Sequence, residues 1–172
     1  MRRHDFFPPR LLCENVSAIV TPLPGNTYLP MLRKIVGGAK TSVDVIQYQW
    51  NFYPYERTLP LQQFNQDVMN MIRRGVKFRI LLNVENITHK ITRINQQTEK
   101  NFKSVGATVK YGPSNIITHS KLFIVDDNYV ILGSHNLSKK SVSQNDETSI
   151  LINSREAVKE YRRYFELLLA RS

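Results

Sequence analysis

The stretch that decides the fold of this chain is THSKLFIVDDNYVILGSHN, residues 118–136. Its segment 122–125 is apolar at every position, which predicts a central strand covered on both faces. Asp127 and Asn128 predict a two-residue hairpin turn, after which residues 129–132 return as an antiparallel strand. The hairpin therefore brings the residues that precede the first strand close to those that follow the second.

Polar side chains gather where this hairpin starts and ends. His119 and Lys121 are two residues apart, so they project to the same side of an extended chain. Gly133, Ser134 and Asn136 follow the returning strand and come back beside them. An imidazole, an ammonium, a hydroxyl and a carboxamide, with no carboxylate among them, favour a tetrahedral anion such as phosphate. The alternative for His119 and Lys121 is a buried polar pair with no role in catalysis.

The spacing of these residues, His-x-Lys-x4-Asp-x6-Gly-Ser-x-Asn from His119 onward, resembles the signature of the phospholipase D superfamily, including its phosphodiesterase-type nucleases. Residues 145–147, Asn-x-Glu, stand where that family tends to place a glutamate. The helix and strand expected between residues 27 and 50 look like the opening of phospholipase D-like domains. The resemblance therefore covers nearly the whole chain from Ser17 onward.

The resemblance implies covalent catalysis at phosphorus. One histidine attacks, a second protonates the leaving oxygen, and water then releases the phosphohistidine. Lys121, Ser134 and Asn136 would hold the nonbridging oxygens and stabilise the charge of the transition state. We expect no cofactor and no metal, because the sequence has no His-x3-His pair, no clustered aspartates and no cysteine pair.

The chain carries one copy of the motif, although this chemistry needs two histidines. His89 is followed directly by Lys90 and lacks the rest of the pattern, and His4 and His135 fail the same comparison. A chain with half a site can complete it by pairing across a two-fold axis, which brings the same loop to the interface twice. We therefore predict a homodimer whose shared pocket takes three residues from each copy: His119, Lys121 and Asn136.

Two carboxylates belong to the pattern, and chain length separates their roles. Asp126 lies seven residues beyond His119, about 23 Å along an extended strand, so it cannot reach that imidazole. Asp126 and Gly133 are therefore expected to be structural. Glu147 opens a strand after a loop and is the candidate to accept the ring N–H of His119 and fix its tautomer. The alternative for Glu147 is an ordinary surface glutamate.

The rest of the sequence predicts strands that alternate with helices. The fold class is α/β, an α/β/α sandwich around a mixed, mostly parallel sheet. Residues 1–16 are expected to form a loosely attached arm, residues 17–172 one catalytic domain, and residues 138–145 a loop. Strands are expected near 17–21, 42–50, 76–83, 106–111 and 147–152, and helices over 27–36, 61–74, 86–105 and 154–169.

Charge is the strongest feature of the composition. The 172 residues carry a formal net charge of +10, which favours a polyanionic partner, either nucleic acid or an anionic lipid surface. The alternative is a basic surface kept for solubility. Lys90 and Arg93, on the basic helix expected over 86–105, are candidate contacts to a phosphate backbone or part of a solvated helix face.

Trp50 belongs to an aromatic segment, residues 48–55, just past a predicted strand end. Strand ends are where open α/β sheets place their sites, so Trp50 is a candidate substrate-binding residue on which bases stack. A lip that dips into lipid, a subunit interface and simple core packing are the alternatives.

Features of the whole chain favour a soluble protein. Cys13 is the only cysteine, so neither an intrachain disulfide nor a cysteine-based zinc site is expected. No apolar run approaches the ~20 residues of a membrane span, and the first residues lack the apolar core of a signal peptide. We expect a cytoplasmic rather than a membrane-bound protein.

The leading hypothesis is a metal-independent nuclease with little sequence preference, acting on DNA or RNA. A phospholipase or phosphatidyltransferase that uses the same histidine chemistry is the second hypothesis, although the sequence has no amphipathic membrane anchor. A non-catalytic nucleic-acid-binding module is the third, and the intact motif argues against it. Neither the type of nucleic acid nor its strandedness follows from these residues.

Overall fold

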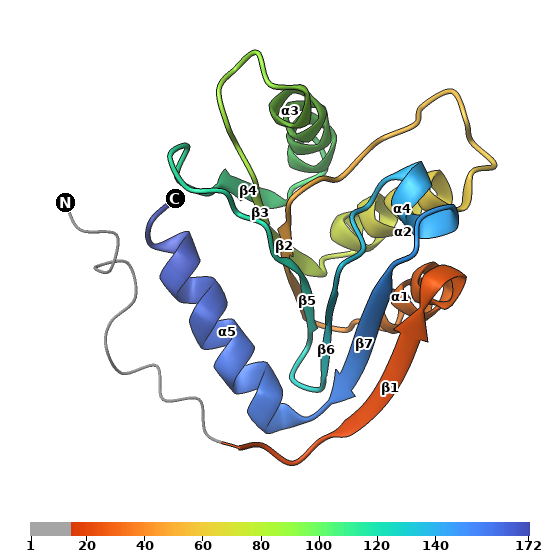
Figure 1. The fold of residues 1–172 in the computed structure, drawn as a ribbon, viewed down its shortest axis with the longest axis vertical. Helices are drawn as coiled ribbons and strands as arrows, with labels where there is room; N and C mark the ends of the chain where they lie inside the picture. Colours follow the sequence, from red (N-terminus) through yellow and green to blue (C-terminus); the bar gives the residue numbers. More distant parts are fainter. Residues whose placement is uncertain (1–14) are drawn as a thin grey trace.

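The computed structural model describes residues 15–172; most of the expected arm 1–16, together with Cys13, lies outside the described residues. A seven-stranded sheet runs through the described part in the order β1-β7-β6-β5-β2-β3-β4 (Figure 1). Its strands are β1 (Ile19–Pro24), β2 (Ser42–Gln47), β3 (Lys77–Leu82), β4 (Thr108–Tyr111), β5 (Lys121–Val125), β6 (Tyr129–Gly133) and β7 (Thr148–Asn153).

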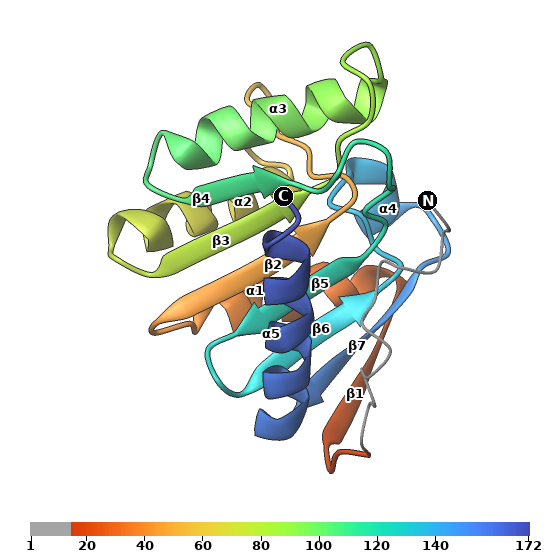
Figure 2. The ribbon, with the colours of Figure 1, turned by 90° about the vertical axis from the view of Figure 1, so that its left-hand side faces the viewer.

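Helices cover the sheet on two sides. They are α1 (Tyr28–Gly37), α2 (Pro60–Arg73), α3 (Lys90–Lys103), α4 (Lys139–Ser143) and α5 (Arg155–Leu169), with the 3-10 turn η1 (Gly25–Thr27) before α1. Helix α5 crosses one face, as Figure 2 shows, and packs on it through Ala157, Val158 and Phe165. Side chains of α1, α2 and α3 pack on the other face. This is the predicted α/β/α sandwich.

The sheet is mixed, as predicted, but the expectation that it is mostly parallel is wrong. Only β2 with β3 and β3 with β4 pair in parallel. The pairings β1–β7, β7–β6, β6–β5 and β5–β2 are antiparallel. The pattern of alternating helices and strands predicts crossovers, but it does not say which strands become neighbours. Here β1 crosses to the far edge, and β5 to β7 fold back on one another in succession.

Three local details differ from the sequence-based expectations. The turn between β5 and β6 holds three residues, 126–128, because Val125 pairs with Tyr129. Strand β1 continues through Pro22, which an edge strand tolerates because one side of it makes no ladder bonds. Residues 139–143, expected within a loop, form the short helix α4, where the Ser138 hydroxyl caps the N–H of Ser141.

Two apolar clusters hold the layers together. The larger fills the space between the sheet and α1, α2 and α3, and it contains Val45, Phe123 and Ile131 from the central strands. The smaller lies beneath α5 and contains Ile46, Leu122 and Ile124. Neighbouring residues of β2 and β5 thus alternate between the clusters, as expected for strands buried on both faces.

Candidate active site

His119 and Lys121 lie where β5 begins, next to the ends of β2 and β3. Because β5 is antiparallel to β2, its first residue, Lys121, pairs with Gln47, the last residue of β2. Leu122 pairs with Leu132, so Lys121 also lies beside Gly133 at the end of β6. The hairpin thus brings the start of one strand to the end of the next, at the edge where the parallel strands β2 and β3 end.

The Lys121 ammonium points at the His119 residue. Lys121 is 7% exposed, and its Nζ donates to the His119 carbonyl oxygen at 2.6 Å and lies 3.2 Å from His119 Nδ1. The same Nζ lies 5.2 Å from the centre of the Tyr48 ring, and that ring lies 4.7 Å from the imidazole. A cation, an imidazole and a phenol therefore share one small volume.

Burial sets the protonation of this pair. It lowers the pKa of Lys121 to about 8, and the Glu147 carboxylate opposes that shift only in part. Burial and the neighbouring Lys121 charge lower the pKa of His119. At pH 7 the imidazole is therefore predominantly neutral. An ammonium can only donate, so Nδ1 accepts and the ring proton lies on Nε2.

Gly133 and Ser134 fasten the end of β6 to β7. A Cβ atom on Gly133 would collide with the Ser149 side chain and with the Thr148 backbone, so only glycine fits there. The Ser134 hydroxyl donates to the Thr148 carbonyl at 3.2 Å and accepts from the Thr148 N–H at 3.0 Å. In this state the hydroxyl expected to bind phosphate binds the neighbouring strand.

Asn136 sits on a loop that runs beside the segment following β2. Leu137 donates its N–H to the Gln49 carbonyl at 3.0 Å and accepts from the Asn51 N–H at 2.8 Å. These bonds carry the loop across the end of the sheet toward Lys121. The carboxamide oxygen of Asn136 is buried and has no hydrogen-bond partner in the described part of the chain.

Glu147 holds this loop rather than His119. Its carboxylate accepts from the Ser141 hydroxyl at 2.8 Å and from Asn145 Nδ2 at 3.2 Å. Burial acts to raise its pKa, but hydrogen bonds from neighbouring side chains, Ser141 and Asn145 among them, outweigh it and lower the pKa. The expected bond from the His119 ring is absent among residues 15–172. Within one chain the Glu147 carboxylate is therefore bonded to the loop that follows β6.

Ser141 is a residue of the site that the sequence pattern did not single out. It is 2% exposed, and its hydroxyl accepts the backbone N–H of Asn136 at 2.8 Å while it donates to Glu147. The signal was weak because a serine in a polar loop is ordinary, and the helix α4 that buries it was not expected.

Asp126 lies at the opposite end of the hairpin from His119. Its carboxylate accepts the backbone N–H groups of Lys40, Thr41 and Ser42 at 2.8, 2.9 and 3.0 Å. It also accepts from the Thr41 hydroxyl at 2.7 Å. These bonds tie the turn to the chain entering β2, so Asp126 fixes the register of the strands that carry the site.

Trp50 is a core residue, and the expectation that it binds substrate is wrong. It is 0% exposed and packs against Phe64, Phe102 and Phe123. Its indole N–H donates to Asn65 Oδ1 at 2.8 Å. The chain after β2 turns inward between the sheet and the helices, so this indole points away from solvent.

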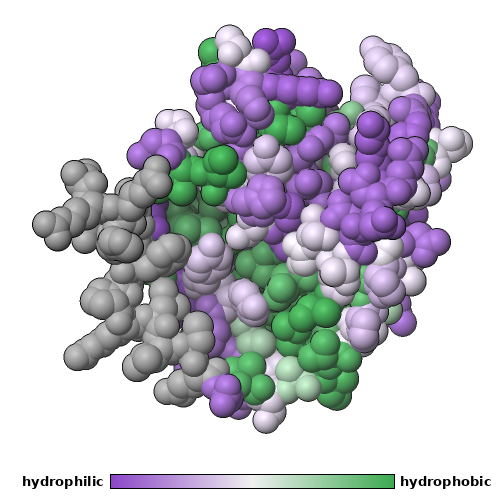
Figure 3. Space-filling view, in the orientation of Figure 1, coloured by the Kyte–Doolittle hydropathy of each residue, from purple (hydrophilic) through white to green (hydrophobic). Residues whose placement is uncertain are grey.

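Lys90 and Arg93 lie at the start of α3, on the side of the molecule where the site lies. Both are exposed. The Tyr48 hydroxyl lies 3.5 Å from Glu85, and Glu85 lies 3.3 Å from the His89 ring, so the start of α3 is linked to the site. Figure 3 has the orientation of Figure 1, in which α3 lies at the top, and it shows mostly hydrophilic residues over that part of the surface.

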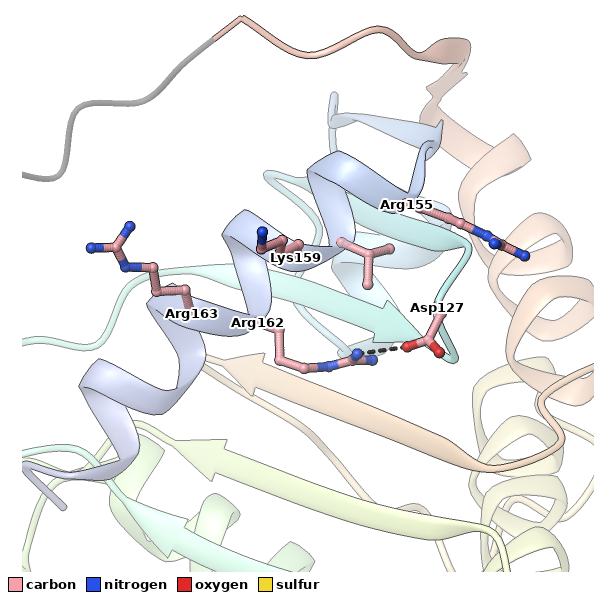
Figure 4. A pocket seen from close by; sticks show the side chains of 6 residues that line it. Asp127, Arg155, Lys159, Arg162 and Arg163 are labelled. Carbon is pink, nitrogen blue, oxygen red and sulfur yellow. Dashed lines mark hydrogen bonds and ion pairs between the residues drawn. The ribbon is translucent and has the colours of Figure 1, made fainter.

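A second group of cations lies on α5, at the other end of the hairpin. Figure 4 shows Arg155, Lys159 and Arg163 along the helix, with Arg162 bonded to Asp127 at 2.7 Å. The first three side chains are exposed, and none has an ion pair or hydrogen bond within residues 15–172. We name Arg155, Lys159 and Arg163 the α5 basic row.

Two other features are absent from the part of the chain that the structure describes. Across residues 15–172, no helix combines the length and apolar character needed to cross a bilayer. The same part of the chain has no group of three or more His, Cys, Asp or Glu side chains placed to hold a metal ion.

The chain is similar in sequence and in fold to known proteins. A family model described as cardiolipin synthase, PLD-like domain, matches residues 32–169. A phospholipase D of Rickettsia felis is 33% identical over 96 residues, which are 55% of this chain and 44% of that protein. The matched part of the chain is thus less than half the length of that relative.

Two solved structures share the fold over almost their whole length. The phospholipase D family member Nuc from Salmonella typhimurium superposes with a TM-score of 0.72 at 20% identity, covering 91% of this chain and 96% of that one. NucT from Helicobacter pylori superposes with a TM-score of 0.69 at 19% identity, covering 90% of this chain and 98% of that one. With the His119 motif and the family match over most of the sequence, the chain belongs to the phospholipase D superfamily, whose enzymes act on phosphodiester bonds.

Proposed function

We propose that this protein is a metal-independent nuclease that cuts DNA or RNA with little sequence preference, through a phosphohistidine in a site shared by two copies. The observation that carries the proposal is the contact between the His119 imidazole and the buried Lys121 ammonium at the sheet edge. A neutral imidazole can attack phosphorus, and a cation beside it stabilises the negative charge that grows on the nonbridging oxygens.

The reaction proceeds in two displacements at phosphorus. His119 Nε2 of one copy attacks phosphorus, and the P–O bond to the leaving group breaks as the protonated His119 of the second copy gives its proton to that oxygen. A water molecule then attacks the phosphohistidine, loses a proton to the second imidazole, and breaks the N–P bond. Lys121 and Asn136 hold the nonbridging oxygens in both steps.

The second copy would also correct the ring tautomer. Attack by Nε2 requires the proton on Nδ1, yet Lys121 Nζ faces Nδ1 in the single chain. An acceptor for the Nδ1 proton, together with a shift of Lys121 when a second copy docks, would reverse this arrangement. Glu147 of the same chain is the candidate acceptor, since it lies close enough to Lys121 for their charges to interact.

Charge supports nucleic acid as the substrate. The formal net charge is +10, and exposed cations stand near the site at Lys90 and Arg93 and again along the α5 basic row. Contacts at both ends of the hairpin suit a long polyanion better than a small phosphodiester.

A phospholipid substrate is the second candidate, and one observation favours it. Ile87 and Ile117 are 74% and 60% exposed, in the segments that lead into α3 and into His119. Exposed isoleucines beside a phosphate site suit a lipid interface, and a relative carries the name phospholipase D. The same side chains also suit contact with a second copy of this chain, as the homodimer requires.

Cleavage assays separate these candidates. The protein is incubated with plasmid DNA, single-stranded RNA and phosphatidylglycerol vesicles, each in the presence of a chelator. We expect cleavage of nucleic acid and none of lipid, with loss of cleavage in His119→Ala. Lipid turnover alone would support the second candidate, and binding without cleavage would contradict an enzyme.

Mixed dimers test the shared site. Equal amounts of wild-type and His119→Ala chains, unfolded and refolded together, give about one quarter wild-type dimers. If each site needs two His119 rings, activity falls to about a quarter of that of the same total amount of wild-type chain. If each chain works alone, activity falls only to half, which would contradict the composite site.

A further inference from the structure

Gln47, the last residue of β2, is a buried polar side chain without a partner. It is 0% exposed, and neither Oε1 nor Nε2 of its carboxamide has a hydrogen-bond partner in the described part of the chain. An unpaired buried amide destabilises a fold, and such groups are rare in native proteins unless they serve a function or bind water.

Gln47 lies directly beside the candidate active site. It pairs with Lys121 across β2 and β5, and both side chains point to the face where Val45 and Phe123 also lie. Side chains of such partners have Cβ atoms about 5 Å apart. On the other side of Lys121 the neighbour is Gly133, which has no side chain. Gln47 is thus the side chain that can reach Lys121 from an adjacent strand.

A second unpaired group lies close by. The Oδ1 atom of Asn136 is buried without a partner, and the loop of Asn136 runs along the segment that follows Gln47. The unpaired atoms are complementary. Gln47 Oε1 can accept from Lys121 Nζ, and Gln47 Nε2 can donate to Asn136 Oδ1.

We propose that Gln47 is a positioning residue that joins Lys121 to Asn136 when an anion occupies the site, each link being direct or through one water molecule. This inference rests on the proposed function, because it assigns Gln47 to the same site. Lys121 Nζ turns from His119 Nδ1 to Gln47, which frees Nδ1 to carry the ring proton. Asn136, held by its oxygen, directs its NH2 group at a nonbridging oxygen.

Three other titratable side chains surround the Lys121 ammonium. His119, Tyr48 and Glu147 are the titratable residues that face its ammonium, and each is left unchanged by a substitution at Gln47. An acceptor at Gln47 favours the charged ammonium, so its removal lowers the pH at which Lys121 loses its proton.

The test replaces Gln47 by Leu and, in a second variant, by Met. Met has nearly the length and shape of Gln, so it fills the same space without the amide group. The matched control is Gln62→Leu, because Gln62 is also buried but accepts hydrogen bonds from the Tyr53 N–H and from Asn65. Three quantities are measured: the melting temperature, kcat and KM for bis(4-nitrophenyl) phosphate, and the NMR titration of Lys121 in inorganic phosphate.

We expect the Gln47 variants to melt at or above the wild-type temperature and to lose about tenfold in kcat. The Lys121 midpoint should fall. Gln62→Leu should lower the melting temperature and leave kcat unchanged. Wild-type kcat and an unmoved Lys121 midpoint in both Gln47 variants would overturn the inference. If the wild type cleaves no phosphodiester but the Lys121 midpoint still falls, the proposed function fails and the Gln47 link stands.

Discussion

The hydroxyl of Ser141 donates to the Glu147 carboxylate at 2.8 Å, and the same oxygen accepts the backbone N–H of Asn136. Glu147 therefore acts on the site through Ser141. The carboxylate fixes the direction of the hydroxyl, and the hydroxyl fixes the loop that carries Asn136. Such a chain of bonds adds to the restraints that the loop has at Ser134, His135 and Leu137.

Replacing Ser141 by Ala should loosen this loop. It leaves the Asn136 N–H without an acceptor and the Glu147 carboxylate without one donor, so we expect about 1–2 kcal/mol less stability and about tenfold lower kcat. Urea unfolding and steady-state kinetics measure the two effects. Ser143→Ala is the control, because that exposed hydroxyl in the same helix bonds, among residues 15–172, only to the Lys139 carbonyl. Equal effects of the two substitutions would contradict a specific role for Ser141.

His119 and His135 should respond to substitution in different ways. His119→Ala should reduce kcat by at least about a thousandfold and change stability little, because the ring is largely exposed and serves chemistry. His135 is 0% exposed, stacks on Tyr28 at 4.1 Å and bonds to Ser149. His135→Ala should instead cost about 2–4 kcal/mol of stability. The reverse pattern would place the catalytic imidazole at His135.

The sequence predicts which motif residues come together because they are close along the chain. The hairpin brings His119, Lys121 and Gly133 together through local pairing alone, and a two-residue repeat is enough to orient the first two. Asp126 could be assigned to structure from chain length alone.

The positions of residues that depend on long-range packing could not be predicted from the sequence. The interpretation of Trp50 as a residue on which bases stack is wrong because an aromatic segment after a strand does not state which way its indole points. Ser141 and Gln47 become notable only when burial is known, since both residue types are ordinary in solvent. The hairpin strands β5 and β6 pair antiparallel with β2 and β7. The order of helices and strands along the chain does not say which strands become neighbours, so these pairings could not be predicted.

Lys121 should destabilise the folded protein at neutral pH. Its pKa in the folded chain is lowered to about 8, below the unfolded value near 10.4, so the charged form is disfavoured by folding. The cost is fully present below pH 8 and disappears as the pH rises from there toward 10.4. We expect Lys121→Met to be about 2 kcal/mol more stable than wild type at pH 7, by urea unfolding.

The advantage of Lys121→Met should shrink when the same measurement is made at pH 9.5. Lys139→Met serves as the control, because Lys139 is exposed and pairs with Glu56 on the surface. A difference for Lys121→Met that stays constant between pH 7 and pH 9.5 would contradict a lowered pKa in the folded state.

Asp126→Ala should destabilise the hairpin. The substitution leaves the N–H groups of Lys40, Thr41 and Ser42 without their acceptor, at a cost of about 2 kcal/mol. Burial acts to raise the pKa of Asp126, but these bonds outweigh it and lower the pKa. The contribution is therefore present above the unfolded pKa and is lost as the pH falls through the lower folded value.

The pH dependence gives this prediction a second measurement. The stability difference between wild type and Asp126→Ala should be constant from pH 5 to 7 and narrow below about pH 4. Asp127→Ala is the neighbouring control, because Asp127 is 76% exposed and its pairing with Arg162 is worth little in water. A loss of stability as large in Asp127→Ala would contradict the assignment of the anchor to Asp126.

The α5 basic row should contribute to nucleic-acid affinity without entering the chemistry. It begins beside the β5–β6 turn, and the five residues of β5 separate that turn from His119 by about 17 Å. A polynucleotide can contact both ends of the hairpin, whereas a dinucleotide cannot. Replacing Arg155, Lys159 and Arg163 together by Glu should weaken binding of a long strand and flatten its salt dependence by up to about three units.

The control for this triple substitution carries the same change of charge at another place. Lys34, Arg73 and Arg74 are exposed at the ends of α1 and α2, and their replacement by Glu alters the net charge equally. Affinity measured by fluorescence anisotropy should fall more for the α5 basic row, while both triples hydrolyse bis(4-nitrophenyl) phosphate at the wild-type rate. A contact on α5 depends on where the cations lie. If both triple variants lose the same affinity, the net charge of the protein attracts the nucleic acid, and the predicted contact with the α5 basic row is contradicted.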